Sequence, residues 1–440
     1  MSHLDAVIDA PGPKKLLSID GGGIRGLIAI EFLAKIESLL RKNFERPDLV
    51  LADYFDYVAG TSTGAIVSVF IAMGHSMDEI RGFYLAGAQM MFEPANLFQR
   101  VARKSNGPLA LLFGMIGVFM NPAIFTPAKL SKTIMEICGE LTTLGSERLR
   151  TLSMIVMRNA STDSPWWISN NPRAMYNLKS VGEDGQLCSN LDIPLWKLVR
   201  ASTAAPIFFP PEEIYVPGVK RPFIFQDGGV TVHNNPAFQL FLMATLPEYQ
   251  LGWPAGEKSL LLVSVGTGLC ESEDLNLKTH QMKLLYNVQA LPAALMRSAT
   301  NEQDLLCRVF GKLRPWCNMP KWDSEIGDLV GNDSPIKEKL FTYLRYNAEL
   351  SEGGLMRLGL FDAAKTRSSI DPKALQPLDG TSYIDELRTV GAAAAACITL
   401  DDFDGFLTAR PRRFGGPVKP LVFVHKQGGR GDGGDEWRNS

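Results

Sequence analysis

One serine lies in a setting that suits a nucleophile. Ser62 is the centre of Gly60-Thr61-Ser62-Thr63-Gly64, a GxSxG pattern. Small residues on both sides let the chain bend sharply from a strand into a helix, which holds a serine hydroxyl exposed above a sheet. An apolar run precedes this pattern and another follows it. Because GxSxG also occurs by chance in ordinary turns, this context is what favours a nucleophile at Ser62.

A glycine-rich turn at residues 21–26 (GGGIRG) has two interpretations. Successive glycine amides at the start of a helix can stabilise an oxyanion, and an arginine there can add positive charge or brace the loop. The turn also satisfies GxGxxG, the fingerprint of a dinucleotide site, which needs an acid about 20 residues later after a second strand. Glu45 and Asp48 have that offset but lie in a polar link. The closely following serine pattern favours an oxyanion hole made of Gly21, Gly22, Gly23 and Arg25.

Two residues are candidates for the base that would activate Ser62. Asp227 ends an apolar run, and Gly228 and Gly229 after it leave room for another loop to approach. An isolated pattern of this kind is more often an ordinary turn. A serine triad normally uses histidine, and of the five histidines His233 is the one serious candidate. Sequence spacing leaves both residues open.

Alternating strands and helices must position these residues. Apolar runs predict strands at residues 16–20, 152–159, 222–229 and 259–268, with a further strand ending just before Ser62. Helical spacing of apolar residues predicts helices at 27–42, 65–74 and 77–92. This alternation predicts an α/β fold with a central, mostly parallel sheet. Beyond residue 270 the sequence predicts a largely helical region, including 283–299, 336–350 and 384–400.

Composition excludes several classes of protein. An apolar fraction of 45% and a charged fraction of 21% are typical of a globular protein. The formal net charge of −2 gives no general attraction to nucleic acid, so we expect no nucleic-acid partner. The six cysteines form no CxxC pair, and no ligand spacing suggests a metal. The acidic N-terminus does not resemble a signal peptide, which predicts a cytoplasmic protein with reduced thiols.

Taken together, the three motifs resemble those of the patatin-like phospholipase family. They are Asp20 to Gly26, Gly60 to Gly64 and Asp227 to Gly229, and residues 200–211 and 233–237 also look like segments of that family. The resemblance covers about residues 15–270. It implies a three-layer α/β/α fold with the catalytic domain at 15–270. From the residues themselves we expect 1–14 to be a leader, 271–425 to complete the fold or regulate it, and 426–440 to be a disordered tail.

The resemblance also implies a mechanism and a substrate. Asp227, rather than His233, would accept the proton of Ser62, so that a Ser-Asp dyad forms an acyl-enzyme on membrane phospholipid without a cofactor. Alternatives are a soluble esterase, thioesterase or transacylase with the same dyad, and a non-catalytic or dinucleotide-binding protein. Some bacterial family members are effector lipases that a cyclic nucleotide switches on in anti-phage defence, and this chain is similar to them in size and layout. A cyclic-nucleotide activator is therefore a further hypothesis, although no nucleotide-binding motif stands out after residue 270.

Contact with a membrane surface is a separate expectation. Residues 105–127 carry no charge, and their centre at 109–120 is apolar on all sides but shorter than the ~20 residues needed to span a bilayer. This segment is either a buried core helix or a lid that contacts lipid. We expect peripheral contact with the membrane from the cytoplasm, and the sequence leaves the oligomeric state open.

Overall fold

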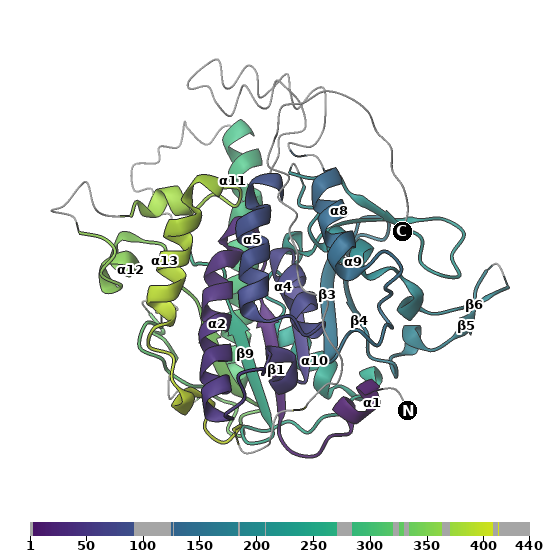
Figure 1. Cartoon of the computed structure of the whole chain (residues 1–440), viewed down its shortest axis with the longest axis horizontal. Helices are drawn as coiled ribbons and strands as arrows, with labels where there is room; N and C mark the ends of the chain where they lie inside the picture. Colours follow the sequence, from purple (N-terminus) through teal and green to yellow (C-terminus); the bar gives the residue numbers. More distant parts are fainter. Residues whose placement is uncertain are drawn as a thin grey trace.

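A nine-stranded sheet forms the middle layer of the chain, and helices cover both of its faces (Figure 1). The structure, a computed structural model, describes residues 3–91, 125, 127–183, 185–206, 208–270, 284–319, 325–329, 334–362, 370–407 and 412. The predicted α/β fold with a mostly parallel sheet is therefore confirmed. The hydrophobic segment 105–127 lies outside the described residues except for Phe125 and Pro127, and the 426–440 tail lies wholly outside them.

The parallel part of the sheet contains six strands. In spatial order they are β10 (Lys312–Leu313), β11 (Thr342–Tyr346), β9 (Leu260–Val265), β1 (Lys14–Ile19), β2 (Tyr57–Thr61) and β3 (Leu152–Asn159). Beyond them, β4 (Ser164–Ser169) and β8 (Phe223–Asp227) pair antiparallel with β3, and β7 (Glu212–Ile214) pairs antiparallel with β8. Only this end of the sheet departs from the parallel arrangement within the described residues.

The two faces of the sheet carry separate apolar cores. Alternation along β1 sends Leu17 and Ile19 to one core and Leu16 to the other, as expected for a strand buried on both faces. One face packs against α2 (Gly26–Asn43), α4 (Thr63–Ala72), α5 (Met77–Met91), α8 (Pro127–Cys138), α9 (Leu195–Ser202) and α13 (Ile384–Ala395). The other packs against α1 (His3–Ile8), α10 (Ala237–Thr245) and α11 (Leu284–Phe310). Short helices α3 (Leu51–Tyr54) and α12 (Glu352–Arg357) complete the set of α-helices described here.

Strand β3 brings two other strands together end to end. Thr61 at the end of β2 pairs with Val156 of β3, and Asp227 at the end of β8 pairs with the next residue, Met157. Because β4 occupies one side of β3 from Met154 to Asn159, β2 and β8 must share the other side. Their carboxyl ends therefore meet. Ser62, which follows β2, is therefore a neighbour of Asp227, which ends β8, although 165 positions separate them in the sequence.

Two predicted segments are wrong. The loose leader predicted at 1–14 is wrong for its described part, residues 3–14, because α1 buries Leu4, Val7 and Ile8 and Lys14 begins β1. Lys14 Nζ also donates to the carbonyls at the end of α1, including Val7 O at 2.9 Å. The segment 336–350 is not helical, because its centre forms β11, a fully buried strand whose aromatic residues and threonine favour a sheet.

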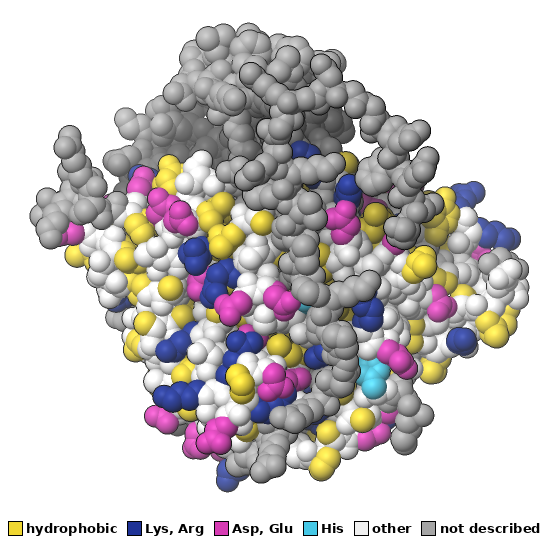
Figure 2. Space-filling model, viewed as in Figure 1, with side chains coloured by type: hydrophobic (Ala, Val, Ile, Leu, Met, Phe, Trp, Pro, Cys, Tyr) yellow, Lys and Arg dark blue, Asp and Glu magenta, His cyan; other side chains and the backbone are white. Residues whose placement is uncertain are grey.

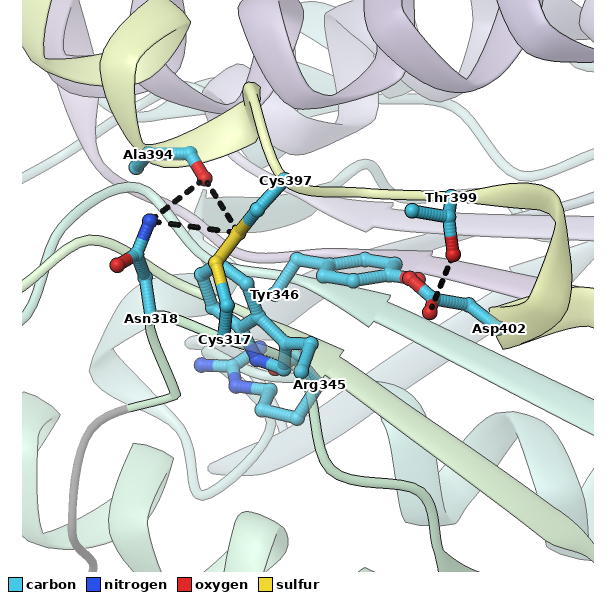
Figure 3. Close-up of a disulfide and its surroundings, with 9 residues drawn as sticks. Cys317, Asn318, Arg345, Tyr346, Ala394, Cys397, Thr399 and Asp402 are labelled. Atoms are coloured by element: carbon cyan, nitrogen blue, oxygen red, sulfur yellow. Dashed lines mark hydrogen bonds between the residues drawn. A yellow bond between two sulfur atoms is a disulfide. The ribbon is translucent and has the colours of Figure 1, made fainter.

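The cysteines also differ from expectation. Cys317 and Cys397, 80 residues apart, form a disulfide that joins the chain after β10 to the end of α13 (Figure 3). Asn318 lies beside it and donates to Ala394 O at 3.3 Å. The other four cysteines are free. The expectation of uniformly reduced thiols is therefore wrong for this pair, because sequence spacing says nothing about which cysteines the fold brings together.

Candidate active site

Ser62 and Asp227 contact each other directly at the junction of β2 and β8. Ser62 Oγ donates to Asp227 Oδ2 at 2.6 Å, and the other carboxylate oxygen accepts the Gly229 amide at 2.7 Å. A Cβ on Gly228 would lie 2.5 Å from Val156 O, so only glycine allows the chain to pass this close to β3. The serine and aspartate that the sequence singled out are thus brought within hydrogen-bond distance.

The backbone at Ser62 is strained in the way a nucleophile elbow requires. Its φ is 55° and its ψ is −122°, a region that non-glycine residues rarely adopt and that occurs mainly at functional sites. Gly60 and Gly64 make this turn possible, because a Cβ at either would lie within 2.3 Å of a backbone oxygen. Helix α4 begins at the next residue, so its N-terminal amides add positive potential beside the hydroxyl.

The segment that ends α9 holds both residues in place. Ser202 Oγ accepts the Ser62 amide at 2.9 Å and donates to Val156 O at 2.5 Å. Ala204 O accepts the Asp227 amide at 3.0 Å. Residues 202–204 therefore hold the backbones of Ser62 and Asp227 in place relative to β3. The sequence drew attention to residues 200–211 but indicated no role for Ser202.

The glycine loop lies beside Ser62, and among the described residues two of its amides are unpaired. The Gly21 amide donates to Asn234 O at 3.0 Å, so it is occupied. Within the described residues, the amides of Gly22 and Gly23 have no acceptor, and both glycines line the cavity next to Ser62. A Cβ on Gly22 would lie 2.0 Å from Thr267 Oγ1, which explains why the loop needs glycine there. Of the three glycines predicted for an oxyanion hole, two therefore have an amide available.

Arg25 faces away from the site. Its guanidinium donates to Cys270 Sγ, and it is not among the residues that line the cavity. The positive charge that secures the loop comes instead from Arg345 on β11, which forms a buried two-point ion pair with Asp20 at 2.6 and 2.9 Å. This pairing could not be predicted, since 325 residues separate the partners and β11 itself was predicted to be helical.

The environment of Asp227 tunes its basicity. Burial raises the pKa of this carboxyl from 3.8 to about 6, although the hydrogen bonds from Ser62 and Gly229 and the charge of Arg200 all lower it. Arg200 is fully buried in the last turn of α9, against the ring of Phe209. At neutral pH Asp227 is therefore mostly ionised, yet it is a much better proton acceptor than an exposed aspartate.

His233 lies close in sequence but takes no part in this hydrogen-bond network. Its ring packs edge-on against Trp167, with 4.9 Å between ring centroids, and burial lowers its pKa to about 4. Its backbone oxygen accepts the Thr61 hydroxyl at 2.7 Å. Among the described residues, the ring has no hydrogen bond to Ser62 or Asp227. The contacts of His233 are those of a structural residue.

An apolar cavity of about 440 Å³ opens beside the Ser62 hydroxyl. Its walls come from distant parts of the chain, namely Ile24 and Ile66, Tyr84 on α5, Leu130 on α8, Phe208 and Phe209, Met296 on α11, and Leu378. The Ile24 amide donates to Leu378 O at 2.9 Å, which fixes this last wall to the glycine loop. The cavity suits a hydrocarbon chain whose polar end lies at Ser62. Sequence reasoning missed both Met296 and Leu378, for which no local motif exists.

This arrangement combines a strained serine, a buried carboxylate, free amides and an apolar cavity, as acyl transfer from an ester requires. A sequence model of patatin-like phospholipases matches residues 17–241, just over half of the chain. The chain belongs to the patatin-like phospholipase family. Its match ends before α11 and Leu378, so part of the cavity is built by residues outside the matched segment.

Bacterial and plant members of the family are similar to this chain. It is 28% identical over 269 residues to a cGAMP-activated phospholipase of Escherichia coli (strain TW11681), covering 61% of this chain and 65% of that protein. It is 30% identical over 230 residues to a cGAMP-activated phospholipase of Vibrio cholerae serotype O1, covering 51% and 56%. Patatin group J-1 of Solanum tuberosum is 28% identical over 262 residues, covering 58% and 60%. The match thus spans less than two thirds of each relative.

Proposed function

We propose that this patatin-like chain hydrolyses acyl esters of membrane phospholipids, with Ser62 as nucleophile and Asp227 as its base. The 2.6 Å hydrogen bond between Ser62 Oγ and Asp227 Oδ2 is the observation that carries this proposal. Family membership supports a lipid hydrolase, and the buried, ionisable carboxylate supports a dyad that needs no histidine. No helix among the described residues is long and apolar enough to cross a bilayer.

The reaction proceeds in two halves. Asp227 accepts the Ser62 proton as Oγ attacks the ester carbonyl, and the Gly22 and Gly23 amides hydrogen-bond the resulting oxyanion. The tetrahedral intermediate then collapses, and the leaving alcohol takes the proton from Asp227. In the second half a water molecule gives a proton to Asp227 and attacks the acyl-serine, which releases the fatty acid and restores the Ser62 hydroxyl. Each oxyanion donor contributes about 10²–10³-fold to such a reaction and the base about 10²–10⁴-fold.

The apolar cavity supports a long-chain acyl group as the recognised part of the substrate. Each buried CH₂ contributes about 0.8 kcal/mol, so a chain that fills the cavity binds far better than an acetyl group. A soluble esterase or thioesterase with the same dyad is the alternative, and it predicts the opposite preference. Comparing kcat/KM for short-chain and long-chain esters separates the two.

The test is release of fatty acid from phospholipid vesicles by four proteins. Wild type and His233→Ala should be active, because His233 contacts neither Ser62 nor Asp227. Ser62→Ala and Asp227→Ala should lose at least about 10²-fold in rate. Loss of activity in His233→Ala with a normal fold, or full activity in Asp227→Ala, would overturn the dyad.

A second proposal concerns regulation, namely that a cyclic nucleotide activates this chain. Its support is the similarity to two bacterial proteins that are cGAMP-activated phospholipases. Fatty-acid release is measured with and without each member of a panel of cyclic oligonucleotides, at a protein concentration where basal activity is low. Stimulation by one of them supports the proposal, and identical rates with all of them remove it.

A further inference from the structure

A group of large apolar side chains projects from one flank of the molecule. Six of them are between 54% and 75% exposed, and we call them the hairpin patch: Met175, Tyr176, Leu178, Val181, Leu187 and Tyr215. Most lie on or just before the hairpin of β5 (Ser180–Val181) and β6 (Leu187–Cys188), which extends outward at the right of Figure 1. Scattered exposed apolar residues are ordinary, but a group of this size in one place indicates a binding surface.

Tyr215 joins the hairpin through a neighbouring loop. The Glu183 amide in the turn of the hairpin donates to Gly218 O at 2.8 Å, and a Cβ on Gly218 would lie 2.4 Å from Cys188 Sγ. The loop that connects β7 to β8 is therefore packed against the hairpin. This loop also carries two exposed cations, Lys220 and Arg221.

The sheet register places this loop at the same edge of the sheet as Ser62. Asn159, the last residue of β3, pairs with Phe225 of β8, so Phe223 at the start of β8 lies beyond the carboxyl end of β3. Ile214 pairs with Phe223, and the connecting loop therefore continues past this edge. Ser62 follows β2 at the same edge. The loop and the nucleophile share one end of the sheet.

The composition of the patch suits a lipid surface better than a protein partner. Three exposed cations, Lys179, Lys220 and Arg221, are interspersed with the apolar residues of the patch. Exposed acidic residues also lie nearby, namely Glu183, Asp192 and Glu213. Figure 2 shows apolar, basic and acidic side chains near one another at this flank. Lysine is depleted from the centres of protein interfaces, whereas cations and tyrosines mixed with aliphatic residues are favoured where headgroups meet acyl chains.

We infer that the hairpin patch docks this protein onto the surface of a bilayer that contains anionic lipid. This inference rests on the proposed function, because it supplies the contact through which phospholipid reaches the cavity beside Ser62. The aliphatic side chains and the tyrosines enter the headgroup region, and Lys179, Lys220 and Arg221 contact lipid phosphates. The patch is separate from residues 105–127, the segment for which the sequence leaves open either a buried helix or a lid that contacts lipid.

The test compares two double variants of the full chain. Leu178→Ser/Leu187→Ser removes two aliphatic residues of the patch. Leu141→Ser/Met356→Ser removes two apolar residues elsewhere that are at least as exposed as Leu178, at 92% and 55% against 54%. Co-sedimentation is measured with vesicles of phosphatidylcholine and with vesicles of equal parts phosphatidylcholine and phosphatidylserine. The patch variant should bind both at least about tenfold more weakly, and the control variant should bind as wild type does.

A second set of variants tests the contribution of the three cations to vesicle binding. Lys179→Gln/Lys220→Gln/Arg221→Gln should weaken binding to the phosphatidylserine vesicles by roughly fivefold per cation and leave binding to phosphatidylcholine nearly unchanged. All variants should label with a fluorophosphonate and hydrolyse a soluble ester as wild type does, because none of these residues lines the cavity. Failure of the proposed function would instead appear as a wild type that neither labels nor hydrolyses.

Three results would overturn the inference. The first is equal vesicle binding by the patch variant and wild type. The second is an equal loss of binding in the patch and control variants. The third is a wild type that sediments as a dimer while the patch variant is a monomer with unchanged vesicle binding, which would assign the surface to a second copy of this chain.

Discussion

At the residue scale, the contact between the Ser62 hydroxyl and the Asp227 carboxylate depends on where strands β2 and β8 end. The strained φ of Ser62 and the two glycines after Asp227 allow their side chains to meet over Val156. Local pattern was enough to single out Ser62, whereas Asp227 and His233 both remained candidate bases until the family resemblance favoured Asp227. Ser202, which fixes the Ser62 amide, could not be predicted, because a serine at the end of a helix is equally common as a simple cap.

The pH dependence of activity follows from the raised pKa of Asp227. The carboxyl must be ionised to accept the Ser62 proton, and its pKa is about 6. We expect kcat/KM to be constant above about pH 7 and to fall tenfold per pH unit well below pH 6. The measurement is a pH–rate profile on a soluble ester whose own hydrolysis is corrected for. If kcat/KM instead fell only near pH 4, Asp227 would not be buried during the reaction.

Removing the charge of Asp227 should stabilise the fold at neutral pH. Its pKa is higher in the folded chain than the ordinary value of 3.8, so the folded state binds the proton more tightly and loses stability as pH rises through about 6. Asp227→Asn removes this cost, and we expect it to raise the free energy of unfolding by on the order of 1–3 kcal/mol at pH 8 but not at pH 4. Urea unfolding at both pH values measures the difference. A variant less stable than wild type at pH 8 would contradict this.

At the scale of elements, the sequence predicted what periodicity can reveal. The unit of β1, glycine loop and α2, and that of β2, Ser62 and α4, were both expected, because a buried strand and an apolar helix differ in period. Their meeting with β8 was not, since the carboxyl ends of β2 and β8 come together only through their shared partner β3. Strand β11 was missed because a short, fully buried strand has no alternating pattern to distinguish it from a helix.

The glycine loop offers a direct test of close packing at the site. Gly22→Ala would place a Cβ 2.0 Å from Thr267 Oγ1, so the loop must move away and carry its amide with it. We expect a loss of about 10²-fold or more in kcat, with Ser62 still in place. The matched control is Gly82→Ala on α5, where a Cβ meets nothing within 4 Å.

Circular dichroism at the assay temperature shows whether each glycine variant is folded. The control should have wild-type activity, and its stability should rise slightly because alanine favours a helix. Wild-type kcat in a folded Gly22→Ala protein would exclude this loop from the reaction.

At the scale of the whole molecule, the region beyond residue 270 is part of the site. It supplies β10 and β11 to the sheet, Arg345 to the ion pair beneath the glycine loop, and Met296 and Leu378 to the cavity. The sequence predicted helices in this region but could not show what they pack against. Long-range pairings such as Asp20 with Arg345 are set by topology, which leaves no local trace in the sequence.

The disulfide should matter for the stability of this region. Closing a loop of 80 residues in the unfolded chain contributes about 4–5 kcal/mol in the chain-entropy model, and measured values are commonly about 2–4 kcal/mol. We expect Cys317→Ser/Cys397→Ser to lower the free energy of unfolding by that amount, and a dithiol reductant to do the same for wild type but not for the variant. A thiol-alkylating reagent should modify four cysteines in the unfolded, unreduced protein. A count of six would show that the pair is reduced.

The most direct measurement of the central claim is the site of covalent labelling by a fluorophosphonate, located by mass spectrometry of peptides from the folded protein. We predict a single adduct on Ser62, formed at the wild-type rate in His233→Ala, at least about 10²-fold more slowly in Asp227→Asn, and not at all in Ser62→Ala. An adduct on another residue, or labelling of Ser62 at an unchanged rate in Asp227→Asn, would contradict the account.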